Sequence, residues 1–431
     1  MDAVRLLSQR TLSSRELVEA CLARIAERDG EHSFDGDPQS INAWARVYEE
    51  DALAAAARAD ASLARGDAGL LAGVPLGLKD LYAVAGKPLT ASSRLLDERP
   101  ARSSAVWERL ERAGMVLLGH LHTHEFAAGG TTDQVGNPLR LDRSAGGSSG
   151  GSAAALAARM VPAATGTDTA GSLRIPSALC GTVAVKPTRG LLPLDGVVPL
   201  APTLDHAGPM ARTPADCAAL LAALSGAEPG AAKPLAQLRI APSPRTALVD
   251  LDTPVARGLD SVLASVELVA PPPPDVQLDV GAAFLELLLT ELRPYHRRFD
   301  DRRALYRPAL REWVEAAEER EPPPDRVDAV QTRRAADADA WHAWFAAHRI
   351  DALVEPTVPC VAPLRGTGYD HAFTDARLIA LTHYWDWVGL PVVAFPSGAD
   401  DATGLPVGAS LIGPPGSEWQ LLAAAEELYA R

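Results

Sequence analysis

The segment Gly-Thr-Asp-Thr-Ala-Gly-Ser-Leu-Arg-Ile-Pro occupies residues 166–176, and a second glycine- and serine-rich segment, Gly-Gly-Ser-Ser-Gly-Gly-Ser, precedes it at 146–152. Lys79 lies further upstream, in Gly-Val-Pro-Leu-Gly-Leu-Lys-Asp at 73–80. A serine hydroxyl is a poor nucleophile until a base removes its proton, and lysine is one base that can replace histidine in this role. The combination therefore points to nucleophilic catalysis by serine.

Helices and short apolar strands are predicted to alternate around these segments. A capping-box pattern at Ser13–Glu16 opens the first clear helix, and Gly66 is a stop signal for a later one. The predicted helices cover about 14–29, 49–65, 103–113, 152–158 and 213–224, and the predicted strands cover 76–78 and 115–118. This alternation indicates an α/β protein with helices on both faces of a sheet.

Composition excludes several other classes of protein. The 431 residues are 47% hydrophobic and carry a net charge of −14, which argues against a nucleic-acid surface. The sequence has no apolar run long enough to span a membrane and no secretory signal pattern, so we expect a cytoplasmic protein with no membrane partner. The four cysteines form no CxxC pair, and Cys180 reads as a small buried residue.

The chain resembles the amidase signature family of serine hydrolases. The stretches that carry the resemblance are 73–80, 124–127, 144–155, 166–176, 180–181, 186–188 and 205–209, with a weaker echo at 389–391 and 404–408. The resemblance implies a large twisted mixed β-sheet covered on both faces by α-helices. It also implies a single domain over residues 1–431, with a divergent, mostly helical region at about 228–350. Within that region, 228–275 is the best candidate for an excursion on the surface.

The resemblance assigns roles to the three residues quoted first. Ser172 matches the nucleophile, Ser148 matches a serine that follows a cis peptide bond, and Lys79 matches the lysine to which that serine bridges. Lysine must be neutral to accept a proton, so its pKa must fall by about 3 units, which burial among apolar groups can achieve. If residues 76–79 form a strand, the neighbouring Asp80 points to the opposite face.

The family also implies an oxyanion hole made by backbone N–H groups. The matching residues are Thr169, Ala170, Gly171 and Ser172. The family usually has glycine where this chain has Ala170, and alanine keeps the N–H group. The charged neighbours Asp168 and Arg174 are expected to hold this loop by an internal ion pair.

Two alternatives compete with this interpretation. Residues 147–151 formally match G-x-S-x-G, the nucleophile elbow that would make Ser149 the nucleophile, but no strand is predicted directly before them. His120, His122 and His124 alternate as metal ligands on a strand can. Residues 124–127 match a family segment with no metal role, which favours polar wall or packing residues. We expect no cofactor and no metal.

The expected function is that of a stand-alone hydrolase that cleaves a C–N acyl bond in an amide or carbamate (urethane) through an acyl-enzyme. The alternatives are an amidotransferase A-type subunit that makes ammonia with a partner protein, and a non-catalytic binding descendant. The predicted substrate-binding residues are Ala128, Gly129, Gly130, Trp385 and Trp387. Trp341 and Trp344 are assigned to the core. The expected partner is a small-molecule substrate, and a homodimer is compatible with the sequence.

Overall fold

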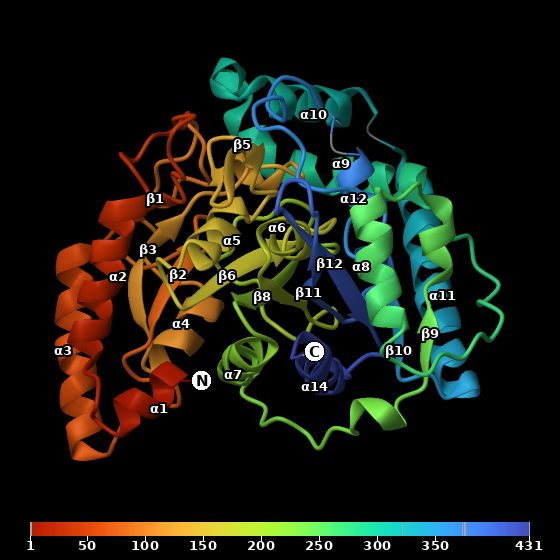
Figure 1. The fold of residues 1–431 in the computed structure, drawn as a ribbon. Helices are drawn as coiled ribbons and strands as arrows, with labels where there is room; N and C mark the ends of the chain where they lie inside the picture. Colours follow the sequence, from red (N-terminus) through yellow and green to blue (C-terminus); the bar gives the residue numbers. More distant parts are fainter. Residues whose placement is uncertain (1, 321, 373, 375, 431) are drawn as a thin grey trace.

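The fold is organised around one large mixed sheet (Figure 1). The computed structural model describes residues 2–320, 322–372, 374 and 376–430. Within these residues ten strands form the sheet, in the order β1 (Trp44–Val47), β3 (Val116–Leu121), β2 (Pro75–Lys79), β6 (Ala163–Asp168), β8 (His206–Ala211), β7 (Val183–Lys186), β11 (Val392–Ala399), β12 (Pro406–Ile412), β10 (Ala352–Pro356) and β9 (Ile240–Pro242). β2 runs parallel to β3 and β6, and β9 runs parallel to β10, whereas β8, β11 and β12 pair antiparallel with their neighbours.

Helices pack on both faces of this sheet. They are α1 (Asp2–Ser8), α2 (Ser14–Arg28), α3 (Glu49–Arg65), α4 (Ala105–Arg112), α5 (Gly150–Ala157), α6 (Arg174–Cys180), α7 (Pro214–Ser225), α8 (Thr253–Leu263), α9 (Gly281–His296), α10 (Pro308–Glu319), α11 (Pro324–His348), α12 (Ala376–Ile379), α13 (His383–Val388) and α14 (Glu418–Tyr429). On β7, Val183 and Val185 join one core with α7, while Ala184 joins a different core with α5. Because successive strand residues face opposite ways, this division confirms the predicted layering.

Local signals in the sequence set several helix boundaries. The predicted capping box is present at the start of α2, where Ser13 and Glu16 each bond to the other's backbone. The helix predicted over 49–65 is α3, and Gly66 closes it with a φ of 78°. These boundaries follow from local hydrogen bonding and from the left-handed conformation that glycine adopts without strain.

The part of the chain expected to be a surface excursion is instead built into the fold. Ile240 and Ala241 of β9 pair with Ala352 and Leu353 of β10, so residues 240–242 extend the main sheet. The next helix, α8, packs on β11 and β12. The prediction for 228–275 is therefore wrong for these elements, because a strand partner distant in the sequence decides where β9 lies.

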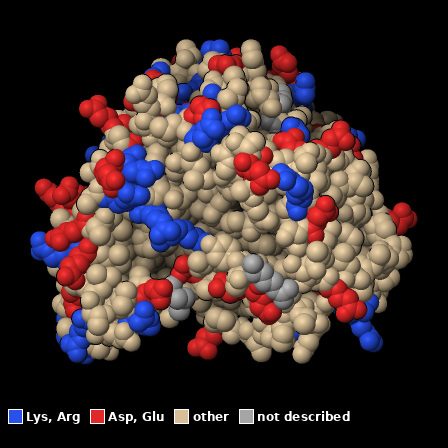
Figure 2. All heavy atoms as spheres, in the orientation of Figure 1, with Lys and Arg blue, Asp and Glu red and all other residues tan. Residues whose placement is uncertain are grey.

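Charge is spread over the visible surface (Figure 2). On that face, acidic and basic side chains are interspersed around a broad area without charge. Among the described residues, no helix combines the length and the apolar character needed to cross a bilayer.

Candidate active site

Lys79 lies at the end of β2 and is completely buried. Its ammonium nitrogen lies 2.8 Å from Ser148 Oγ, 2.9 Å from Ser149 Oγ and 2.8 Å from Thr167 Oγ1. Leu78, the preceding residue, faces the core on the other side of the sheet. The strand thus brings a lysine from an apolar segment against the serine segment that follows β5 (Arg140–Ser144). The sequence did not point to Thr167 as a third partner.

The surroundings of Lys79 favour its neutral form. Burial lowers the pKa of Lys79 to about 7, although the negative charges of Asp168 and Asp205 act in the opposite direction. Asp80 follows directly, but its carboxylate turns away and accepts hydrogen bonds from the backbone of Thr90 and Ser92. The alternation of a strand therefore separates this carboxylate from the amine, as predicted. A buried lysine with such a pKa can accept a proton near neutral pH.

Ser148 lies in a tightly enclosed turn between β5 and α5. The Gly147–Ser148 peptide bond is cis, as the resemblance implies. A side chain at Gly147 would have its Cβ only 2.0 Å from the carbonyl oxygen of Thr131. The carbonyl of Ser148 accepts hydrogen bonds from His124 N–H and from the Thr132 hydroxyl. The lack of a side chain at Gly147 therefore allows this turn to pack directly against the backbone of Thr131.

Ser172 lies in the loop between β6 and α6, and it faces a cavity. The N–H of Ser149 donates to the Ser172 carbonyl at 3.3 Å, so the two serine-bearing segments are in direct contact. Asp168, at the end of β6, accepts hydrogen bonds from the N–H groups of Gly171 (2.5 Å) and Leu173 (3.1 Å). Its carboxylate also pairs with both the Nε and Nη2 of Arg174. The expected internal ion pair within this loop is therefore confirmed.

The predicted oxyanion donors do not all have the same orientation. The Gly171 N–H is already used by Asp168, so it is not free to bind a substrate oxygen. Thr169, Ala170 and Ser172 line the cavity, whereas Gly171 does not. The set predicted from the resemblance is thus corrected at Gly171, because a carboxylate three residues earlier captures its N–H.

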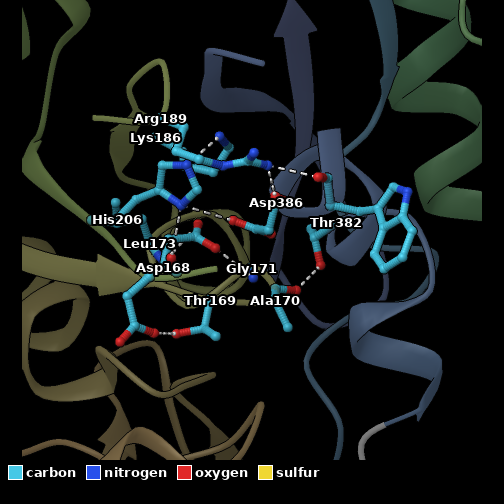
Figure 3. Close-up of polar contacts among 12 residues, drawn as sticks. Asp168, Thr169, Ala170, Gly171, Leu173, Lys186, Arg189, His206, Thr382 and Asp386 are labelled. Atoms are coloured by element: carbon cyan, nitrogen blue, oxygen red, sulfur yellow. Dashed lines mark hydrogen bonds and ion pairs between the residues drawn. The ribbon is translucent and has the colours of Figure 1, made fainter. Parts of the chain in front are cut away.

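A network of buried charges lies behind this loop (Figure 3). Arg174 Nη2 donates to Asp386 Oδ2 at 2.5 Å, which ties the loop to α13. The other oxygen of Asp386 lies 3.4 Å from His206 Nδ1, and His206 Nε2 lies 3.4 Å from the Lys186 amine. Burial lowers the pKa of Lys186 to about 7. Because groups buried away from water cannot exchange these partners for water molecules, the network fixes the position of the loop relative to α13.

The cavity in front of Ser172 has a volume of about 310 Å³. Ala128, Gly129 and Gly130, which the sequence analysis proposed for substrate binding, line it together with residues that the sequence did not suggest. Those include Phe284, Leu285 and Leu288 of α9, Trp313 of α10, Ile379 of α12 and His383 of α13. Among the described residues that line it, none is Asp, Glu, Lys or Arg. The wall is therefore an apolar surface that bears a few neutral polar groups.

His383 is one of the polar groups on this wall. Its Nδ1 lies 2.7 Å from the Ile379 carbonyl oxygen, so this nitrogen carries the proton and Nε2 is an acceptor. Among the described residues Nε2 has no hydrogen-bond partner. Burial lowers the pKa of His383 to about 4, which keeps the ring neutral at physiological pH.

Trp385 and Trp387 do not reach the cavity. Both are completely buried, and their indole N–H groups donate to Glu355 Oε1 at 2.5 Å and to Asp337 Oδ2 at 2.8 Å. Neither lines the cavity. Their predicted contact with substrate is thus corrected: core carboxylates bind the polar edges of both rings, and the first residue of the same helix, His383, faces the cavity instead.

The remaining candidates occupy structural positions. His120 contacts the Tyr48 hydroxyl, His122 contacts Ser92 and His124 contacts the Thr131 carbonyl, so each histidine has a different partner. Cys180, Trp341 and Trp344 are buried, as predicted. Ser149 contacts Lys79 and occupies the N-cap position of α5. The structure places a strand, β5, at residues 140–144, where the sequence predicted none, and a turn over residues 145–149 separates it from α5.

Comparison with known proteins identifies the family. A model of the family described as Amidase matches residues 16–288 and 295–422. The chain therefore belongs to the amidase family, whose members are enzymes that act on carbon–nitrogen bonds. The A-type subunit of glutamyl-tRNA(Gln) amidotransferase from Pseudomonas aeruginosa (strain LESB58) is 32% identical over 99% of this chain and 95% of its own length. Its counterpart from Roseiflexus sp. (strain RS-1) is 44% identical, but the match covers 53% of this chain and 46% of that relative.

Solved structures share the whole fold. One of them comes from work on the evolutionary origins of an s-triazine catabolic enzyme. It superimposes on this chain with a TM-score of 0.87 at 30% identity, and the match covers 100% of this chain and 97% of that one. A bacterial aryl acylamidase of the amidase signature family gives a TM-score of 0.83 at 25% identity over 99% of this chain and 94% of that one.

Proposed function

We propose that this chain is a stand-alone serine hydrolase that cleaves amides or carbamates with a hydrophobic or aryl group. Ser172 is the proposed nucleophile, because it is the serine that both faces the cavity and lies on the loop held by Asp168. Ser148 and Lys79 are the proposed proton relay. Their 2.8 Å contact and the lowered pKa of Lys79 support this role.

In the proposed reaction, a proton first passes from Ser172 towards Lys79 and is later delivered to the leaving nitrogen. Neutral Lys79 takes a proton from Ser148, which takes one from Ser172 as its Oγ bonds to the acyl carbon. The carbonyl oxygen becomes an oxyanion that accepts hydrogen bonds from the N–H groups at 169, 170 and 172. The relay then protonates the leaving nitrogen as the C–N bond breaks, and water later cleaves the acyl-enzyme by the reverse route.

The observation that carries the stand-alone assignment is the uncharged cavity wall. Glutamine, the ammonia donor expected in the amidotransferase role, has an α-ammonium and an α-carboxylate group. Removing such charges from water without a partner is costly. The described lining offers no charged side chain to either group, whereas Phe284, Leu288 and Trp313 provide apolar surface for an aryl or alkyl group.

The amidotransferase role is the second candidate. The 32% identity to the A-type component of a glutamyl-tRNA(Gln) amidotransferase, over nearly the whole chain, favours it. That role requires glutamine as a substrate and a partner protein with which the chain makes ammonia for a charged tRNA. The amidotransferase role therefore needs a cavity that binds a charged amino acid, whereas the proposed hydrolase needs one that binds an apolar group.

The test is to purify the chain alone and offer it phenylacetyl and hexanoyl p-nitroanilides, an aryl carbamate, acetamide and glutamine. We expect turnover of the apolar anilides or the carbamate and no ammonia from glutamine, with the Ser172→Ala variant as the background control. Release of ammonia from glutamine, with no turnover of any apolar substrate, would support the amidotransferase role instead.

A further inference from the structure

The Ala170–Gly171 peptide unit is held at both of its ends. Its N–H, on Gly171, donates to Asp168 Oδ1 at 2.5 Å. Its carbonyl oxygen, on Ala170, accepts a hydrogen bond from the hydroxyl of Thr382 (Figure 3). This unit lies between the N–H of Ala170 and the N–H of Ser172, so its orientation determines where those two donors point.

Thr382 is well placed to hold this peptide. It lies between α12 and α13, is only 1% exposed, and its own carbonyl accepts a hydrogen bond from Arg174 Nη1 at 3.0 Å. The Ile379 carbonyl, at 3.3 Å, is the other acceptor within reach of its hydroxyl. Arg174 also pairs with Asp168, so one guanidinium group links the two residues that hold the peptide.

The packing at Gly171 supports the same conclusion. Gly171 has a φ of 131°, and a Cβ added there would lie 2.3 Å from Thr382 Oγ1. Thr382 therefore lies directly over the backbone of Gly171, where only a residue without a side chain fits. The residue that makes this contact lies 212 positions beyond Ala170 in the chain.

We propose that Thr382 is a positioning residue for the oxyanion hole. Its hydroxyl fixes the Ala170–Gly171 peptide so that the N–H groups on either side of it converge on one substrate oxygen. Donors that are already oriented stabilise the transition state without reorganisation. This inference rests on the proposed function, because it concerns the same reaction. It adds that Thr382, which lies between two helices that contribute to the cavity wall, controls the stabilisation of the transition state without lining the cavity itself.

The test compares Thr382→Val, which removes the hydroxyl at nearly constant volume, with Thr382→Ser, which keeps it. We expect Thr382→Val to lower kcat by about tenfold to a hundredfold and to change KM by less than about threefold. A boronic acid analogue of the preferred acyl group should bind the Val variant more weakly by a similar factor, because it imitates the tetrahedral oxyanion. Thr382→Ser should restore kcat to within about threefold of the wild type.

Thr357→Val is the matched control. Thr357 is also a buried threonine, and its hydroxyl forms a hydrogen bond with Ser410 and not with the loop that carries Ser172. It should lower thermal stability without changing kcat or the affinity for the boronic acid. If Thr382→Val does not fold, Thr382→Ala carries the same comparison, since it removes the hydroxyl with less steric demand.

The outcomes separate the two proposals. An unchanged kcat in folded Thr382→Val, an equal loss in Thr357→Val, or no recovery in Thr382→Ser would overturn the positioning role and leave the hydrolase assignment standing. A wild-type enzyme with no activity towards any amide or carbamate of the panel would overturn the proposed function, and the positioning role with it.

Discussion

Two regions meet at the cavity, and they differ in how they are built. The ends of β2 and β6 and the segments that follow β5 and β6 carry polar groups that pair with one another, such as Lys79 with Ser148 and Asp168 with Arg174. The wall formed by α9, α10, α12 and α13 contributes mainly apolar side chains, such as Phe284 and Ile379. The first region needs exact hydrogen-bond geometry, whereas the second needs only shape and apolarity. Chemistry and substrate preference are therefore separable in this molecule.

The largest effect is expected in the first region. Ser172→Ala should lower kcat/KM by about 10³-fold or more, because the nucleophile is lost, when measured with the best anilide of the panel. Ser149→Ala is the matched control, since Ser149 also contacts Lys79 but does not line the cavity. It should retain most activity. A loss confined to the Ser149 variant would show that the nucleophile has been assigned to the wrong serine.

The pH profile tests the same region next. Lys79 is protonated and inactive below its lowered pKa of about 7, so kcat/KM should rise as the pH increases through about 7 and then level off. The apparent value belongs to the coupled Lys79–Ser148 pair. Lys79→Ala should lower activity by about 10²- to 10⁴-fold and abolish this rise. The control is Lys87→Ala, since Lys87 pairs with Asp51 on the surface. A rise that persists in the Lys79 variant would assign the titration to another group.

Smaller effects, limited to substrate preference, are expected in the second region. Phe284→Ala removes part of the cavity wall, so it should lower kcat/KM for the phenylacetyl anilide by about tenfold and leave acetanilide nearly unchanged. Trp385→Ala is the contrasting variant. It should lower the free energy of unfolding by about 3–5 kcal/mol and leave the ratio between the two substrates unaltered. If the ratio of the two kcat/KM values changed in the folded Trp385 variant, Trp385 would have to contact the substrate.

The smallest effect is expected at His383. Replacing it with phenylalanine loses the bond to Ile379, but it also removes a buried nitrogen for which the described residues offer no partner. The edge-to-face contact with Phe284 can persist. The free energy of unfolding, measured with urea, should therefore change by less than about 1 kcal/mol. A loss above about 2 kcal/mol would show that Nε2 has a partner in solution, such as a bound water.

The features that the sequence predicted correctly are those that depend on residues close together in the chain. α2 and α3 were foreseen because caps and stop signals act over a few residues. The strand position of Lys79 followed from a short apolar run. The roles of Trp385 and β9 could not be foreseen, because each depends on a partner remote in the chain: Glu355 for the indole and β10 for the strand.

The sequence by itself determined the α/β class, the family, and the lysine and serines proposed to carry the reaction, because those features lie in short contiguous motifs with their own geometry. Only the tertiary structure decided which surface faces the substrate. It turned Trp385 and Trp387 inward to buried carboxylates, brought α9 and α10 over Ser172, and set Thr382 against Ala170. Side-chain burial depends on every element packed around it, and no local pattern contains that information.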